Sequence, residues 1–140
     1  MKTAGNIISI EEVKKRLTPL FKDQGLQIAL LFGSSVTGEV HKHSDIDLAL
    51  LYDRPVDILI LTNRVIRYLR NDNVDVVDLR RASPLLKYSI LKKGRLLYEK
   101  PLGTFNTFYS LTFRRYIDTK KLRDAQAETI KYFLETRNLV

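Results

Sequence analysis

Two aspartates stand at the start of an apolar run in the first half of the chain. The segment from Ile46 to Leu51 is apolar except for Asp47, and Asp45 precedes Asp47 by two positions. Residues two apart in a β-strand project from the same face, so we expect the two carboxylates to point the same way. Two carboxylates this close repel each other unless a positive charge lies near both. Mg²⁺, which prefers oxygen ligands and commonly keeps coordination positions for phosphates, would supply that charge.

A second motif has the properties of a phosphate-binding turn. Gly33 and Ser34 end the apolar run from Ile28 to Phe32. Glycine lets the backbone approach a phosphate closely, and a following helical turn over residues 34–38 would direct its free N–H groups at the anion. The two motifs together predict a phosphate-binding turn that faces a metal-binding pair of acids.

The combined pattern resembles the signature of the DNA polymerase β-like nucleotidyltransferase superfamily. Gly33-Ser34 is followed after ten residues by Asp45-Ile46-Asp47, and Gly38 and Ser44 stand where small members of the superfamily have them. The resemblance implies an α/β (α+β) fold with a small mixed sheet flanked by helices. It also implies a nucleotide held at Gly33, Ser34 and Ser44, two Mg²⁺ ions on three carboxylates, and transfer of a nucleoside monophosphate.

The third carboxylate has two candidates in the strand expected from Val74 to Leu79. An acid inside such an apolar strand is costly unless it has a partner. Asp75 stands where members of the superfamily carry a metal-binding aspartate that also helps to deprotonate the acceptor, and we predict that it joins Asp45 and Asp47. Asp78 is the alternative; it lies three residues further on and must face the other side of the strand.

The segment from Val74 to Glu99 resembles the minimal nucleotidyltransferases of prokaryotic toxin–antitoxin pairs. The resemblance implies an antitoxin that transfers AMP from ATP to a tyrosine of a cognate HEPN-family toxin ribonuclease. The antitoxin and the toxin would form a hetero-oligomeric complex. Two other readings are neutralisation of the toxin by binding alone and nucleotide addition to RNA ends. Direct binding of nucleic acid is not expected under the main interpretation.

The composition fits one compact domain. The 140 residues are 44% hydrophobic and include no Cys, which excludes disulfides and thiolate metal sites. No run of eighteen apolar residues occurs, so we expect no membrane span and a cytoplasmic protein. The net charge of +8 attracts polyphosphates, acidic proteins and nucleic acids alike, and does not choose among them.

Local patterns predict the elements that position these acids. We expect helices over 10–22, 55–70 and 84–93, the last capped by Ser83 and ended by Gly94, and strands over 27–32, 44–52, 74–79 and 95–98. Ser9 has the spacing of a helix cap, Pro19 disturbs the first helix, and Pro55 fits the start of the second. Residues 39–44 are expected to form a polar loop.

The last forty residues differ in character from the rest, and we divide the chain into a nucleotidyltransferase core, 1–100, and a C-terminal helical extension, 101–140. Two helical stripes run along the extension, on either one long helix or two helices joined near Asp118. The stripes are Phe105, Phe108, Tyr109, Thr112 and Tyr116, then Leu122, Ala125, Thr129, Tyr132 and Phe133. Their aromatic content predicts a surface for the core, for a partner, or for both.

Overall fold

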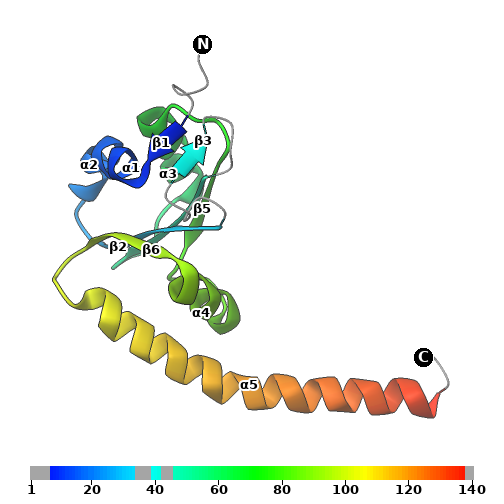
Figure 1. The fold of residues 1–140 in the computed structure, drawn as a ribbon. Helices are drawn as coiled ribbons and strands as arrows, with labels where there is room; N and C mark the ends of the chain where they lie inside the picture. The colour runs from blue at the N-terminus through cyan, green and yellow to red at the C-terminus, as the bar shows by residue number, and fades with distance from the viewer. Residues whose placement is uncertain (1–6, 34–38, 42–45, 138–140) are drawn as a thin grey trace.

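The computed structural model describes residues 7–33, 39–41 and 46–137, and Figure 1 shows their arrangement. The central sheet has the strand order β5-β4-β2-β6; β4 is parallel to β5, and β2 is antiparallel to β4 and β6. This mixed sheet with flanking helices confirms the predicted α/β architecture. The elements are β1 (Ile7–Ser9), α1 (Ile10–Arg16), α2 (Thr18–Phe21), β2 (Leu26–Phe32), β3 (Glu39–His41), β4 (Ile46–Tyr52), α3 (Ile58–Leu69), β5 (Val74–Asp78), α4 (Pro84–Lys93), β6 (Arg95–Glu99) and α5 (Thr104–Thr136).

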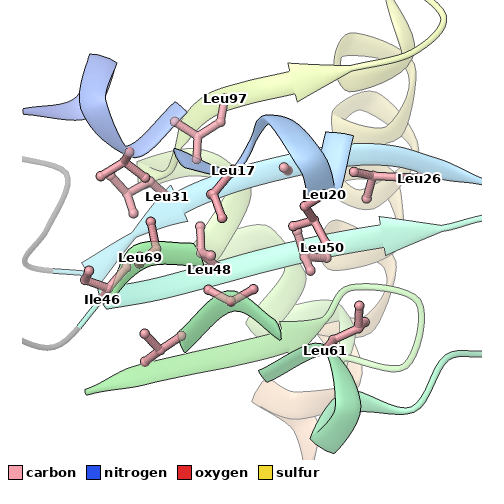
Figure 2. Packing of buried hydrophobic residues seen from close by; sticks show 14 of the residues in the cluster. Leu17, Leu20, Leu26, Leu31, Ile46, Leu48, Leu50, Leu61, Leu69 and Leu97 are labelled. Atoms are coloured by element: carbon pink, nitrogen blue, oxygen red, sulfur yellow. The ribbon is translucent and has the colours of Figure 1, made fainter. Parts of the chain in front are cut away.

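Helices α1, α2 and α3 cover one face of the sheet. Leu17 and Leu20, from the α1–α2 segment, pack with Leu31, Leu48 and Leu50 of the central strands, and all five side chains are buried (Figure 2). Burying each such leucine contributes about 1.5–3 kcal/mol relative to leaving it exposed. This core fixes which residues of β2 and β4 face the first three helices.

Helix α4 and the start of α5 cover the opposite face. The core on this side contains Leu30 of β2, Ala49 and Leu51 of β4, and Ile90 and Leu91 of α4. Both faces of β4 are therefore buried along most of its length, which explains its nearly continuous apolar sequence. The polar side chains of the sheet are left to the ends of its strands.

Two of the predicted helix caps are present. The Ser9 hydroxyl oxygen accepts a hydrogen bond from the Glu12 N–H at 3.1 Å, and the Ser83 oxygen accepts one from the Leu86 N–H at 3.2 Å. Each serine satisfies a backbone donor that has no partner inside the helix. Helices α1 and α4 consequently begin where the sequence predicts.

Helix α3 begins three residues later than predicted, at Ile58 instead of Pro55. The carboxylate of Asp57 accepts hydrogen bonds from the N–H groups of Leu59 and Ile60 at 3.0 and 3.2 Å. The aspartate cap provides an acceptor for two backbone N–H groups that have no partner inside the helix, whereas a proline at a helix start only fixes its own φ angle. The cap therefore sets the boundary, and the prediction based on Pro55 was wrong.

The first predicted helix is divided into α1 and α2. The break falls at Leu17, two residues before Pro19, which stands in the first turn of α2. Proline has no N–H, and its ring clashes with the carbonyl of the residue four positions earlier, so the first helix cannot continue through it. The disturbance expected at Pro19 is confirmed, and it still leaves Leu17 and Leu20 facing the same core.

A short antiparallel pair, β1 and β3, was not predicted. Ile7 pairs with His41 and Ser9 with Glu39, so the expected polar loop is wrong over residues 39–41. Three-residue strands pair through backbone groups distant in sequence, and no local periodicity reveals them. The helical turn expected at 34–38 and residues 42–45 lie outside the described residues.

Gly94 caps α4 in a different way from a typical C-terminal glycine. Its backbone is extended, and its N–H donates to the Ile90 carbonyl at 2.7 Å. A Cβ at this position would lie 2.7 Å from that same carbonyl oxygen. The glycine predicted here is thus required by the close approach of β6 to the end of α4, and not by a left-handed conformation.

The C-terminal extension forms a single helix, α5, of 33 residues, which is about 50 Å long at 1.5 Å per residue. The Glu99 carboxylate accepts hydrogen bonds from the N–H groups of Gly103 and Phe105 and so anchors its first turn. Figure 1 shows α5 passing beneath α4 and continuing well beyond the sheet. No helix among the described residues combines the length and apolar character needed to cross a membrane.

One ion pair ties the turn before β2 to α3. Arg64 donates from both terminal nitrogens to the Asp23 carboxylate, at 2.8 and 2.9 Å, and the Tyr52 hydroxyl donates to it at 2.9 Å. The hydrogen bond from Arg64 lowers the pKa of Asp23. Burial raises this pKa by a smaller amount, and the hydrogen bond from the Tyr52 hydroxyl lowers it further. Burial and then the Asp23 carboxylate raise the pKa of Tyr52.

We predict that Asp23→Asn lowers the free energy of unfolding by about 1–3 kcal/mol at pH 7. Because the folded-state pKa of Asp23 is lowered, the carboxylate's contribution is complete above the ordinary aspartate pKa of about 3.9 and is lost as the pH falls through the folded-state value. Urea unfolding from pH 7 to pH 3 should show the gap between wild type and variant closing. A gap of constant size would contradict the assignment, and exposed Asp118→Asn serves as the control.

Candidate functional site

The parallel pairing of β4 and β5 places two predicted site residues side by side. Asp47 and Asp75 are direct register partners. Neighbouring strands lie about 4.8 Å apart, and paired residues project from the same face of the sheet. Two carboxylates predicted from segments 28 positions apart in the sequence are therefore neighbours.

The acids lie on the face covered by α4 and α5, at the edge where that cover ends. Further along the same face of the two strands, Ala49 and Val77 pack in the core with Leu51. At the strand starts Asp47 is half-buried and Asp75 is exposed. The strands thus hold the carboxylates rigidly, and a ligand can still reach them.

Gly33, which begins the predicted phosphate-binding turn, lies against Asp47. Phe32, the last residue of β2, is the register partner of Asp47, and Gly33 follows with a left-handed backbone, φ 75°. A Cβ at Gly33 would collide with the Asp47 carboxylate oxygen Oδ2. Glycine is needed here both for the backbone conformation and for the space that the carboxylate occupies. Gly33 and the Asp47 carboxylate are therefore directly juxtaposed.

This arrangement suits a hard divalent cation. The donors of Asp47 and Asp75 are carboxylate oxygens, the ligand type that Mg²⁺ prefers, and Gly33 adjoins the Asp47 carboxylate without a side chain of its own. Within residues 7–33, 39–41 and 46–137, no three His, Cys, Asp or Glu side chains gather closely enough to hold a metal ion. The third predicted acid, Asp45, lies outside these residues, as do Ser34 and Ser44.

Asp78, the alternative third carboxylate, is directed elsewhere. Its register partner is Leu50, which packs in the core under α1, α2 and α3. One of its carboxylate oxygens accepts a hydrogen bond from the Arg80 N–H at 3.0 Å, and its carbonyl accepts from Arg81 and Ala82. Asp78 therefore shapes the turn after β5, and it is Asp75 that lies beside Asp47.

Comparison with known proteins identifies the protein family to which the chain belongs. The family model described as polymerase beta, nucleotidyltransferase matches residues 15–101, more than half of the chain. The chain belongs to this nucleotidyltransferase family. The match spans the segments that contain Gly33, Asp45, Asp47 and Asp75.

Relatives with curated names are protein adenylyltransferases. The chain is 29% identical over 141 residues to the protein adenylyltransferase MntA of Aphanizomenon flos-aquae, with 92% of this chain and 93% of the relative covered. It is 38% identical over 76 residues to the MntA of Shewanella oneidensis, covering 52% of this chain and 54% of the relative. The resemblance to minimal nucleotidyltransferases is confirmed.

Solved structures with the same fold come from toxin–antitoxin complexes. One, a toxin–antitoxin with AMP-PNP, has a TM-score of 0.70 at 27% identity and covers 89% of this chain and 99% of the matched chain. Another holds the tri-AMPylated HEPN toxin of Shewanella oneidensis in complex with an MNT antitoxin, with a TM-score of 0.70 at 25% identity, covering 87% and 98%. These neighbours confirm the predicted nucleotidyltransferase fold.

The contact between the Asp47 carboxylate and Gly33, which requires a residue without a Cβ, was not predicted from the sequence. The apolar runs before Gly33 and after Asp45 contained the signal, because two such runs joined by thirteen residues can pair as antiparallel strands. Pairing them with Phe32 opposite Asp47 would have brought the turn against the carboxylate. Periodicity alone does not give the register of that pairing.

We predict that Gly33→Ala reduces affinity for ATP in the presence of Mg²⁺ by at least tenfold, because the new methyl group displaces the Asp47 carboxylate. Gly103→Ala is the matched control, since Gly103 also has a left-handed backbone, φ 94°, but has no atom within 4 Å of an added Cβ. Both variants should lose about 1–2 kcal/mol of stability from backbone strain. Calorimetric titration that found equal ATP affinities for the two variants would refute the steric explanation.

Proposed function

We propose that this protein is an antitoxin that transfers AMP from ATP to a tyrosine of a cognate HEPN-family toxin and so neutralises it. The observation that carries the proposal is the register pairing of Asp47 with Asp75 opposite the Gly33 turn. Membership of the nucleotidyltransferase family gives this pair its chemistry. Relatives named protein adenylyltransferase support a protein as the acceptor.

In this proposal Asp45, Asp47 and Asp75 hold two Mg²⁺ ions. The donor set supports it, because adjacent carboxylates need a cation to offset their repulsion. When bound, such ions neutralise charge on a triphosphate and stabilise the attacking and leaving oxygens of an in-line displacement. The neighbouring structure with AMP-PNP supports ATP as the nucleotide donor.

The residues of the chain then have separate roles in AMP transfer. The turn at Gly33, with Ser34 and Ser44, holds the triphosphate through backbone N–H and hydroxyl groups. The tyrosine oxygen forms a bond to the α-phosphorus, the bond from that phosphorus to the bridging oxygen breaks, and pyrophosphate leaves. Asp75 takes the phenolic proton, and its exposure lets a side chain presented by another protein reach it.

The division of the chain belongs to the same proposal. Residues 1–100 form the nucleotidyltransferase core, and residues 101–140 form a helical extension that packs on the core and on a partner. The two parts make up a single domain. The complex with the toxin is a hetero-oligomer, and the cytoplasm, where ATP and such toxins meet, is its proposed location. Transfer to RNA ends and neutralisation by binding alone are outcomes that the following experiment separates.

We predict that Asp47→Asn and Asp75→Asn each lower the rate of AMP transfer to the toxin by at least about 100-fold, because each removes a charged ligand or proton acceptor. Asp78→Asn, on the other face of β5, should keep the wild-type rate. The measurement follows labelled AMP from ATP, with Mg²⁺, into the purified HEPN-family protein encoded beside this chain.

The distribution of label decides among the functions. Label on a toxin tyrosine, lost in both site variants, supports the proposal. A tight complex with no label would favour neutralisation by binding alone, and label on added RNA would favour an RNA substrate. Transfer that survives in Asp75→Asn and fails in Asp78→Asn would overturn the assignment of the third carboxylate.

A further inference from the structure

We propose that the distal half of α5 is a docking surface for the acceptor protein. The docking surface comprises Arg123, Ala127, Ile130, Phe133, Leu134 and Arg137. This inference rests on the proposed function, since it names where the acceptor of that reaction binds. It is carried by the helical face on which these residues lie, the direction of α5 relative to the site, and the charges around the face.

The docking surface continues the stripe by which α5 packs on its own core. In the first half of α5, Phe105, Phe108 and Tyr109 pack in the core beneath α4, and the Thr112 side chain is buried. Tyr116 then stacks on Tyr88 of α4, with ring centroids 4.2 Å apart. At 3.6 residues per turn the same face continues through the docking surface.

Beyond Tyr116 this face loses its cover among the described residues. Ile130 is 58% exposed and Phe133 47% exposed. The second stripe expected from the sequence was rotated from this face, because Tyr132, 72% exposed, points away from it. The uncovered face therefore belongs to the first stripe. In the first half of α5 this same stripe packs against the core and against α4.

Helix α5 projects past the edge of the sheet that carries the acids. Its start lies near Gln27 and Leu51, at the end of the sheet remote from Gly33, and its middle lies under Tyr88. Figure 1 shows the distal half extending beyond the sheet in the direction in which β2 ends. The start of α5 packs on the same face of the sheet as Asp47 and Asp75, so a protein that is seated on the distal half and also extends back over this face would reach the site.

The arginines of the docking surface and the acids of the distal half lie on opposite sides of the helix, and Lys121 and Lys131 accompany the acids. Arg123 and Arg137 lie on the docking surface, where their guanidinium groups lie 4.9 and 3.9 Å from the ring centroids of Tyr116 and Phe133. The acids Asp124, Glu128 and Glu135 lie on the other side of the helix. The surface thus suits a partner with apolar side chains flanked by acidic groups.

A second copy of the chain fits this surface poorly. Antiparallel pairing of two distal halves would bring Arg123 of each copy toward Arg137 of the other, and like charges oppose each other across an interface. The four apolar side chains of the docking surface also offer only on the order of 300 Å², whereas a stable interface needs about 800 Å² from each partner. A partner that covers both the distal half and the acidic edge supplies the missing area.

The test is the double variant Ile130→Glu with Phe133→Glu, with Tyr132→Glu as the matched control on the opposite side of the same helix. The purified HEPN-family protein encoded beside this chain is titrated against each variant, and AMP transfer to it is measured at several concentrations. We expect the double variant to bind at least tenfold more weakly and to show a raised KM for the acceptor, with ATP affinity unchanged. The control should match wild type in all three measurements.

The outcomes distinguish this inference from the proposed function. Wild-type binding and transfer by the double variant would overturn the docking surface and leave AMP transfer intact. If wild type transfers no AMP but binds, and the double variant binds weakly, the docking surface holds and the transferase proposal fails. A double variant that loses only self-association, measured by light scattering, or only retention of added RNA, would overturn the inference in favour of a second copy or an RNA.

Discussion

The register pairing of Asp47 with Asp75 is the constraint on which the site depends. Parallel strands hold the two side chains at neighbouring positions of one face, about 4.8 Å apart along the sheet. Two carboxylates held on neighbouring strands in this way favour a cation between them. The buried leucines on the other face supply the stability that holds the two strands, and with them the pair of acids, in this register.

The position of the pair follows from how the sheet is covered. Helix α4 and the first half of α5 bury the centre of the face that the acids share, and they leave the start of β4 and β5 uncovered. Gly33 then closes the site from the side of β2, because the absence of a Cβ admits the Asp47 carboxylate. The site is built on strand ends, which hold their side chains more firmly than loops do.

Much of this arrangement could be predicted from local sequence. The strand that carries Asp47, the serine caps and the break at Pro19 depend on neighbours only a few residues away, where periodicity and capping rules apply. The sequence could not give the choice of Asp57 over Pro55 as the start of α3, because two local signals competed. The β1–β3 pair was equally hidden, since it joins segments about thirty residues apart.

The extension shows why surfaces are harder to predict than sites. Either one helix or two fitted the pattern near Asp118, and the structure has one. Which face of the distal half matters depends on the rotation of α5 about its axis, and the stacking of Tyr116 on Tyr88 sets that rotation. A side chain on another element therefore decides that Ile130 and Phe133, and not Tyr132, continue the packed stripe.

Thermal unfolding of wild type and Asp47→Asn, with and without Mg²⁺, tests the central claim most directly. We expect the two carboxylates to bind the cation together. Added Mg²⁺ should then raise the melting temperature of wild type, since a ligand that binds only the folded state stabilises it, and should raise that of the variant far less. Equal responses of the two proteins to Mg²⁺ would contradict the account.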